Sequence, residues 1–157
     1  MKRVALVKAI LQGSRLLKSI LWQWGPAFLM MSAIFAFSSI PSAEVPTFGV
    51  MDFIVKKGGH ALGYGLLALA YLRGLKGKSR NILLRQIFIA WALATLYSAT
   101  DEYHQSFVPG RHPAVTDVLI DSAGAALALV LVYKYRANKN DQPDKLVTDN
   151  QTLNTDD

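Results

Sequence analysis

Four long apolar runs constrain this chain more than any other feature of its sequence. The first extends from Trp22 to Ser39 without a charged residue, and the others cover residues 58–72, 83–100 and 114–135. A helix of about eighteen residues reaches about 27 Å, close to the roughly 30 Å of hydrocarbon in a bilayer. Hydrophobic residues make up 52% of the chain and charged residues 18%, a balance typical of small polytopic membrane proteins. The sequence therefore predicts an all-α membrane protein, a bundle of four transmembrane helices.

The basic residues predict how this bundle is oriented. Five of the seventeen lysines and arginines precede Leu21, five lie between Arg73 and Arg85, and four lie between Lys134 and Lys145. Short cytoplasmic segments carry an excess of Lys and Arg because positive charge is translocated poorly. Both termini are therefore predicted to face the cytoplasm. This topology accounts for the net charge of +6, so we expect no nucleic-acid partner.

The chain divides into three parts of different character. Residues 1–21 place apolar side chains at helical spacing, which predicts an amphipathic segment at the inner membrane surface. Residues 22–136 contain the four runs and form the predicted transmembrane domain. Residues 137–157 lack aromatic residues and any apolar period, which predicts a disordered cytoplasmic tail. A cleaved signal peptide is the alternative for the first run, but Pro41 stands where a small residue is expected.

Charge gathers between the third and fourth runs, in the stretch ATDEYHQSFVPGRHPAVTDVLIDSAGA (residues 99–125). Asp117 and Asp121 are four residues apart, so on a helix they share one face. Gly124 and Ala128 continue that side, and small residues let another helix approach closely. Both carboxylates are therefore expected at a packed interface rather than in lipid.

The second run contributes further polar side chains. His60 and Tyr64 share a helical stripe, and Lys57 lies one turn before His60. Gly59 and Gly63 form a GxxxG pattern, which predicts close helix packing on their face.

The end of the third run adds two more carboxylates, Asp101 and Glu102, followed by Gln105. If the third helix continues outward by one turn, it should present both carboxylates beside His60 and the start of the fourth helix.

Carboxylates, imidazoles and an arginine suit acid–base or metal-assisted attack on a phosphodiester. Such chemistry uses oxygen or nitrogen ligands for a metal, a base with a pKa near neutrality and a cation over developing negative charge. The sequence has no His-x-x-x-His, Gly-x-Ser-x-Gly or phosphate-loop motif, so metal and cofactor stay unknown. It has no cysteine, which excludes thiol nucleophiles, disulfides and Cys-ligated metals.

The same residues also have a purely structural interpretation. Ion pairs that hold the connections down would account for them: Arg111 with Asp117, and Lys57 with Asp101 or Glu102. His104 and His112 lie between helices and are expected to be solvent-exposed. Carboxylates within a membrane cost a few kcal/mol each, which tilts the cluster as a whole toward a function.

Four segments resemble the VanZ-like family of small bacterial membrane proteins. They are DEYHQSFVPGR, FSSIP, KGGHALGY and D-x-x-x-D-x-x-G, and they span roughly Phe37 to Leu131. Two positions depart from the family pattern, because Asp121 stands where Asn is common and Ala128 where a second Gly is frequent. An amide cannot act as a base, so Asp117 is the stronger candidate.

The resemblance implies a multi-pass protein of the bacterial cytoplasmic (inner) membrane with its polar site on the outer face. The family is named for a protein associated with low-level teicoplanin resistance, and its members are usually described as having no known biochemical activity. The expected partners are the lipid bilayer and an anionic lipid or lipid-linked cell-wall precursor, which the protein would bind and, in one version of the hypothesis, modify.

Roles follow for nine residues. Acid–base chemistry or cation binding is expected of Asp101, Glu102 and Asp117, with His60 as the proton carrier. Substrate contacts are expected from Lys57, Tyr64, Gln105, Arg111 and Asp121. The main alternative is a non-catalytic scaffold or accessory subunit whose charges form a structural network. An ion- or proton-coupled carrier is less favoured, because no charge continues a path toward the cytoplasm in residues 67–72 or 87–96.

Overall fold

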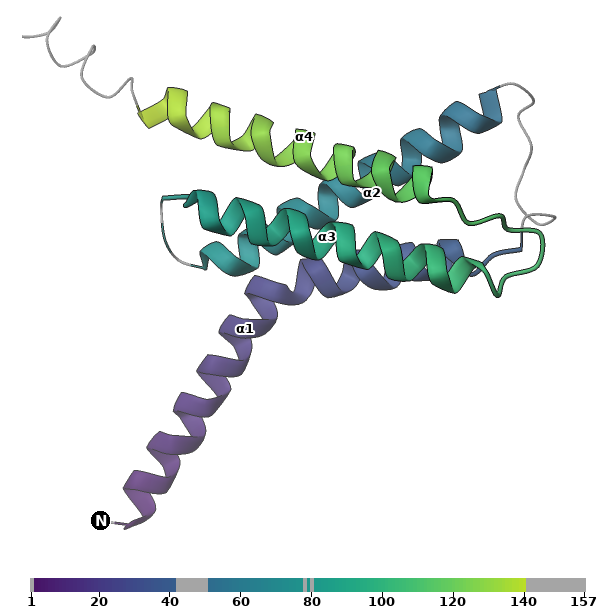
Figure 1. Ribbon diagram of the computed structural model, residues 1–157. Coiled ribbons are helices and arrows are strands. Elements are labelled where there is room, and N and C mark those ends of the chain that lie inside the picture. Colours follow the sequence, from purple (N-terminus) through teal and green to yellow (C-terminus); the bar gives the residue numbers. More distant parts are fainter. Residues whose placement is uncertain (1, 42–50, 78, 80, 141–157) are drawn as a thin grey trace, which may run out of the picture.

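The computed structural model describes the backbone of residues 2–41, 51–77, 79 and 81–140, and the side chains of these residues except 2–11, 51–56 and 140. The described residues form four helices: α1 (Lys2–Ser38), α2 (Met51–Lys76), α3 (Leu84–Gln105) and α4 (Val115–Asn140). The C-terminal end of α1, the start of α2 and the α3–α4 connection lie at one end of the bundle (Figure 1). The end of α2, the start of α3 and the end of α4 lie at the other. The all-helical fold is as predicted.

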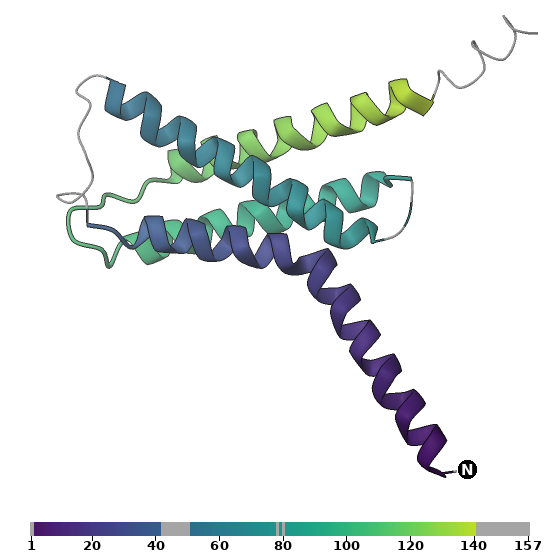
Figure 2. The ribbon, with the colours of Figure 1, turned by 180° about the vertical axis from the view of Figure 1, so that it is seen from behind.

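Helix α1 joins the predicted surface segment and the first apolar run into one continuous helix. Its N-terminal half bends away from the other helices (Figures 1 and 2). Pro26 lies inside the helix and has no N–H, so the Trp22 carbonyl four residues earlier lacks its helical partner. Arg73 of α2 donates from Nη2 to that carbonyl at 3.2 Å, and its guanidinium lies 5.2 Å from the centroid of the Trp22 ring. Arg73 therefore supports α1 at a position where proline weakens it.

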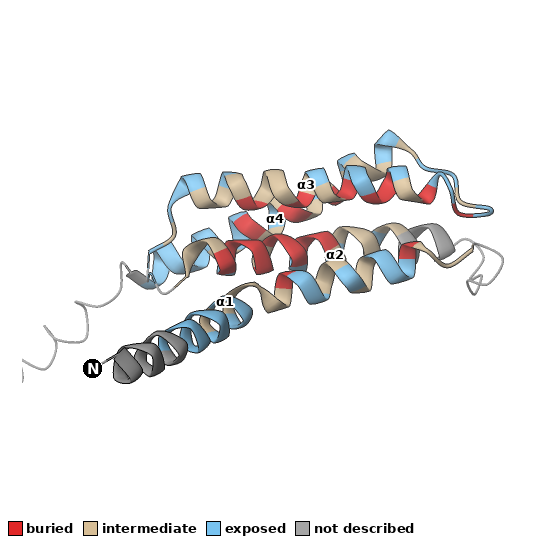
Figure 3. Cartoon of the chain, turned by 90° about the horizontal axis from the view of Figure 1, so that it is seen from below, coloured by how far each residue is buried: buried red, intermediate tan, exposed pale blue. Residues whose placement is uncertain are grey.

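Helix α2 is central to the bundle. It contacts α1, α3 and α4, whereas the described parts of α1 and α4 do not touch each other. Buried residues concentrate along α2 and on the side of α3 that faces it (Figure 3). The buried core is rich in alanine: Ala27, Tyr64, Leu67, Ala68, Ala70, Tyr71, Leu72, Ala90, Ala94, Ala125 and Leu129. Such small side chains allow the helices to lie close together.

The closest approach is between α2 and α4. A Cβ on Gly124 would lie 2.4 Å from the carbonyl oxygen of Ala61, and a Cβ on Gly65 would lie 3.3 Å from the Cβ of Ala128. No side chain fits at Gly124 unless the two backbones move apart. The predicted small-residue face of α4 is thereby confirmed.

The predicted close packing at Gly59 and Gly63 is wrong. A Cβ on Gly59 would have no atom within 4 Å, and a Cβ on Gly63 would meet only Ile34 of α1, at 4.0 Å. This face of α2 looks toward α1, whose larger side chains keep the two backbones apart. The close contact with α4 uses Gly65 instead.

Two glycines at positive φ shape the connections. Gly77, at φ 56°, follows the last residue of α2 and donates from its N–H to the Arg73 carbonyl, which ends the helix. Gly110, at φ 73°, follows Pro109, and the Arg111 N–H donates to the Val108 carbonyl at 3.1 Å. Pro then Gly at the centre of a turn favours the type II geometry. The Val-Pro-Gly-Arg sequence therefore reverses the chain just before Arg111.

The predicted boundaries of α4 differ slightly from those observed. The helix begins at Val115, so Pro113 precedes its first turn, and it continues past Arg136 to Asn140. The rest of the predicted tail, residues 141–157, lies outside the described residues, as do the side chains of residues 2–11 in the predicted surface segment.

Two segments of the described chain are long and apolar enough to cross a membrane, Gln12–Ser38 and Val115–Lys139. Only 6% and 17% of the residues in their most apolar stretches, respectively, are buried within the protein, whereas the core helices of a soluble protein are mostly buried. Large apolar side chains such as Phe28, Leu29 and Leu119 are exposed, and an apolar surface of this kind needs lipid or a partner to cover it. Spanning by α2 and α3 stays a prediction.

Candidate functional site

Charged side chains divide the bundle into two ends. The end with the α3–α4 connection holds all four carboxylates whose side chains the structure describes: Asp101, Glu102, Asp117 and Asp121. We term it the acidic end. The opposite end, termed the basic end, has cationic residues and none of the described carboxylates: Arg73, Lys76, Arg85, Lys134, Arg136 and Lys139.

Helix α3 continues past the third apolar run to Gln105, and this extra turn carries the centre of the acidic end. Asp101 is 3% exposed, and its Oδ2 accepts hydrogen bonds from Ser38 Oγ at 2.6 Å and from Gln105 Nε2 at 3.2 Å. The Ser38 bond joins the last residue of α1 to α3. Asp101 is therefore an interior acceptor that connects two helices.

Glu102 connects α3 to the start of α4. Its Oε2 accepts from the Ala114 N–H at 3.1 Å, and its Oε1 accepts from Gln105 Nε2 at 3.4 Å. Glu102 follows the third apolar run and is 7% exposed. Burial raises the pKa of this carboxyl, and the Ala114 hydrogen bond opposes that rise only in part.

Asp121 lies one helical turn after Asp117 on α4, further from the α3–α4 connection, and is 1% exposed. Its Oδ2 accepts from Ser98 Oγ of α3 at 2.7 Å and lies 3.9 Å from His60 Nδ1 of α2. A carboxylate behind an imidazole nitrogen can orient the ring and stabilise its protonated form. Helices α2, α3 and α4 therefore meet at His60, Ser98 and Asp121.

The cations of the acidic end make contacts that were not proposed from the sequence. Lys57 forms an ion pair with Asp117. Arg111 donates to two backbone carbonyls near the end of α1, from Nε to Ile40 and from Nη2 to Phe37, both at 3.1 Å. The reversal at Gly110 directs Arg111 toward α1, where carbonyls at a helix C-terminus attract a cation. The suggested Arg111–Asp117 pair is absent from the described residues.

The two histidines that the sequence placed between helices behave differently, and His104 lies in the last turn of α3. His112 is exposed, as predicted. His104 is half-buried, so its predicted exposure is wrong: its ring stacks on Phe35 at 4.4 Å, and its Nε2 lies 3.0 Å from Ser39 Oγ.

Sequence reasoning missed the serines that hold the carboxylates. Ser38 and Ser98 are both buried and donate to Asp101 and Asp121, respectively. The available signal was the presence of hydroxyl residues inside otherwise apolar runs, since a buried hydroxyl needs a partner.

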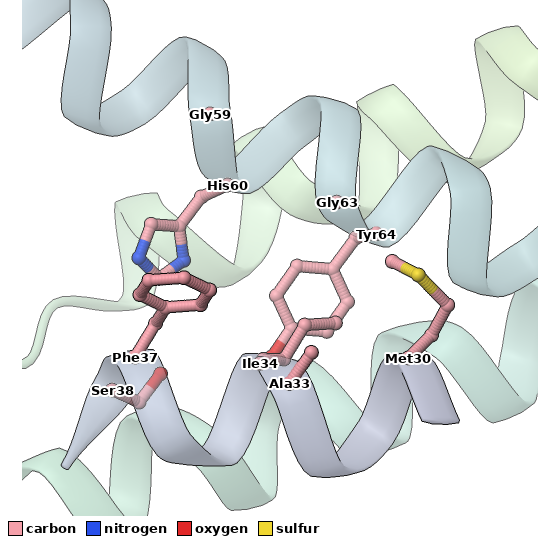
Figure 4. Close-up of a pocket in the computed structure, with 9 residues that line it drawn as sticks. All are labelled: Met30, Ala33, Ile34, Phe37, Ser38, Gly59, His60, Gly63 and Tyr64. Carbon is pink, nitrogen blue, oxygen red and sulfur yellow. The ribbon is translucent and has the colours of Figure 1, made fainter. Parts of the chain in front are cut away.

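A groove between α1 and α2 leads to this network (Figure 4). Its volume is about 340 Å³, and we term it the α1–α2 groove. His60 and Tyr64 point from α2 toward α1, and Gly59 and Gly63 form the rest of the α2 wall. The α1 wall is mostly apolar and ends at a hydroxyl: Met30, Ala33, Ile34, Phe37 and Ser38. The face of Gly59 and Gly63, for which the sequence predicted close helix packing, is instead a wall of this groove.

Three buried oxygens lie near the polar end of the groove. The Tyr64 hydroxyl lies close to the Asp101 and Asp121 carboxylates. Among the described residues, neither this hydroxyl nor Asp101 Oδ1 nor Asp121 Oδ1 has a hydrogen bond of good geometry. Buried polar atoms are usually paired, so these oxygens offer hydrogen-bonding capacity to a polar group. Within the described chain, no three His, Asp or Glu side chains are arranged to hold a metal ion.

All nine predicted site residues lie in or beside the acidic end, but their positions differ. His60 and Tyr64 line the α1–α2 groove. Asp101 and Asp121 lie behind it, next to Ser38 and His60 respectively. The other five are engaged within the protein: Glu102, Gln105, Arg111, Lys57 and Asp117.

The family model VanZ/LLP1 matches residues 20–136, which include every residue of this network. The chain belongs to the VanZ/LLP1 family. The family and the two helices that are apolar enough to span together indicate a VanZ-like membrane protein. No curated protein and no solved structure matches the chain.

Proposed function

We propose that this VanZ/LLP1 protein spans the bacterial cytoplasmic membrane four times, with both termini inside and the acidic end facing outward. There it binds an anionic lipid or a lipid-linked cell-wall component. The topology is supported by the separation of charge along the bundle, because cationic residues without carboxylates favour the cytoplasmic side.

The α1–α2 groove is the observation that carries this function. Its walls are largely apolar over α1 and open over the two glycines of α2, which suits a hydrocarbon chain. It ends at His60 and Ser38, which suit a polar head group. Lys57 lies one turn further out on α2, with a quarter of its side chain exposed. The head group of a bound lipid would therefore lie near the imidazole of His60, and its phosphate near the ammonium group of Lys57.

If the protein also modifies its ligand, His60 is the side chain placed to move a proton. It is the ionisable group on the wall of the α1–α2 groove besides the buried Tyr64. Asp121 would position the ring of His60, and Asp101 would position the hydroxyl of Ser38. The carboxylates then act through neighbouring groups rather than on the ligand itself.

A structural scaffold is the second candidate, and one observation favours it. The polar contacts cross between helices: Ser38 to Asp101 joins α1 and α3, Lys57 to Asp117 joins α2 and α4, and Asp121 joins α3 and α4. Such a network would hold the helices in order without any ligand.

Substitutions at two adjacent glycines test the lipid-binding function. Gly59 lines the groove and Gly58 does not, and a Cβ at either position would meet no atom within 4 Å. Gly59→Leu should fill the groove without disturbing the fold. We expect native mass spectrometry to find lipid bound to the wild-type protein and to Gly58→Leu, and at least a fivefold loss of it in Gly59→Leu.

The same comparison separates the two candidates. Equal lipid retention by both variants would refute binding in the α1–α2 groove and leave the scaffold as the better account. In cells, a role in glycopeptide tolerance predicts that Gly59→Leu increases teicoplanin sensitivity, whereas Gly58→Leu does not. His60→Asn should then weaken preference for anionic over zwitterionic lipid if His60 contacts the head group.

A further inference from the structure

Another cavity lies at the basic end, further along α2 than the α1–α2 groove. Its volume is about 250 Å³, and residues from α2, the α2–α3 connection and α4 line it. Three cationic residues, Arg73, Lys76 and Arg136, share its lining with apolar side chains that include Leu72 and Val132. Cations and apolar walls thus meet in one cavity.

The described part of the protein does little to neutralise the charges of these three cations. The part of the basic end that the structure describes contains no carboxylate. Arg73 uses Nη2 on the Trp22 carbonyl. Among the described residues, no hydrogen-bond or ion-pair partner is found for the side chains of Lys76 and Arg136. Three like charges around one cavity repel each other, and a bound anion lowers that energy.

The surroundings indicate which anion fits. The apolar lining continues toward the middle of the predicted spans through Leu69 and Val132. Tyr133 and Tyr135 are exposed on the last turns of α4, where aromatic side chains typically mark the membrane interface. A free anion would use only the cations, whereas a lipid would use both the cations and the apolar walls.

We propose that this cavity binds the phosphate head group of an anionic phospholipid from the cytoplasmic leaflet. Lys76 and Arg136 contact the phosphate, Arg73 adds positive charge, and an acyl chain follows Leu69 and Val132. Basic pockets between helices on the cytoplasmic side are suited to anionic head groups. This inference rests on the topology proposed above, but not on a ligand in the α1–α2 groove.

Two charge-matched double variants test the site. Lys76→Gln with Arg136→Gln removes two cations that line the cavity. Lys134→Gln with Lys139→Gln removes two exposed cations from the same end that do not line it. Each full-length protein is titrated in detergent with short-chain phosphatidylglycerol, phosphatidylcholine or inorganic phosphate, and binding is followed by the rise in melting temperature.

We expect phosphatidylglycerol to stabilise the wild type and the Lys134/Lys139 variant, and its apparent affinity to fall at least fivefold in the Lys76/Arg136 variant. Equal losses in both variants would show general surface attraction and overturn the proposal. Equal stabilisation by inorganic phosphate would assign the site to a free anion, and equal stabilisation by phosphatidylcholine would remove the role of charge. Gly59→Leu should leave this binding unchanged, so failure here and failure of the groove are separate outcomes.

Discussion

An arginine holds α1 from each end of the bundle, in very different surroundings. Arg111 at the acidic end donates to the Phe37 and Ile40 carbonyls, and Asp101, Glu102 and Asp121 of that end are only 1–7% exposed. Arg73 at the basic end donates to the Trp22 carbonyl, but it is exposed, like most cations near it. Charge at the acidic end is therefore part of the interior, whereas charge at the basic end forms a surface.

This difference has a physical origin. A buried carboxylate is tolerated when hydrogen-bond donors surround it, and Ser38, Ser98 and Gln105 supply such donors at the acidic end. Lysine and arginine carry long side chains that can reach the water or the lipid head groups from a helix end. Substitutions at the acidic end should therefore affect stability, and those at the basic end should affect mainly contacts with the membrane.

The largest expected effect is the difference in stability between a substitution of a buried carboxylate at the acidic end and one of an exposed lysine at the basic end. Asp101→Ala removes the acceptor of the Ser38 hydroxyl and of the Gln105 amide, and each buried donor left unpaired costs about 1–3 kcal/mol. We expect a steep fall in the melting temperature in detergent. Lys139→Ala, at an exposed position, should change stability by no more than about 0.5 kcal/mol. Similar effects of the two substitutions would contradict the distinction.

The second prediction concerns the contact of Arg111 with α1. Arg111→Gln should cost about 1–3 kcal/mol, because two charge-assisted hydrogen bonds at the helix end are lost. Arg111→Lys keeps the charge but not the paired N–H groups, so it should recover only part of the loss in thermal unfolding. Full recovery by lysine would mean that charge alone is needed there.

A smaller effect is expected for the corresponding arginine at the basic end. Arg73→Gln should cost about 0.5–1 kcal/mol through the Trp22 carbonyl and ring contacts. Amide hydrogen exchange around Trp22 and Pro26 should become faster. Arg85→Gln, an exposed cation at the start of α3, provides the control and should leave exchange in α1 as it was.

The smallest expected effect is on the melting temperature of a Glu102 variant, and it depends on pH. Because burial raises the pKa of Glu102 in the folded state, its protonated form stabilises the protein. That stabilisation is present below the ordinary pKa of Glu and is lost as the pH rises through the raised value. Glu102→Gln should therefore melt slightly higher than the wild type at neutral pH, and this difference should shrink in acid. A difference that grows in acid would give the opposite sign and contradict the burial effect.

The structure also shows where sequence reasoning succeeded and where it failed. Run length was sufficient to predict four helices, and residue spacing placed Asp121 and Gly124 on a packed face. The extra turn of α3, on which the placement of Asp101 and Glu102 depended, is present. All of these depend on interactions within one helix or on the repeat of a helix.

Choices between neighbouring faces were less predictable. Gly59 and Gly63 form the better sequence motif, yet Gly65 makes the close contact, because the motif does not say which helix lies opposite. Arg111 had a carboxylate nearby in sequence, but the turn at Gly110 directs it to the carbonyls of α1 instead.

The sequence by itself determined the helices, the separation of acidic from basic residues and the membership of this chain in its family. These follow from hydropathy, helical periodicity and motifs that act over short distances along the chain. Only the tertiary structure decided that Ser38 would donate a hydrogen bond to Asp101, that Lys57 would pair with Asp117, and that the face of Gly59 and Gly63 would line a groove. Such contacts join residues about sixty positions apart, and their partners depend on how far each pair of helices can approach before their side chains collide.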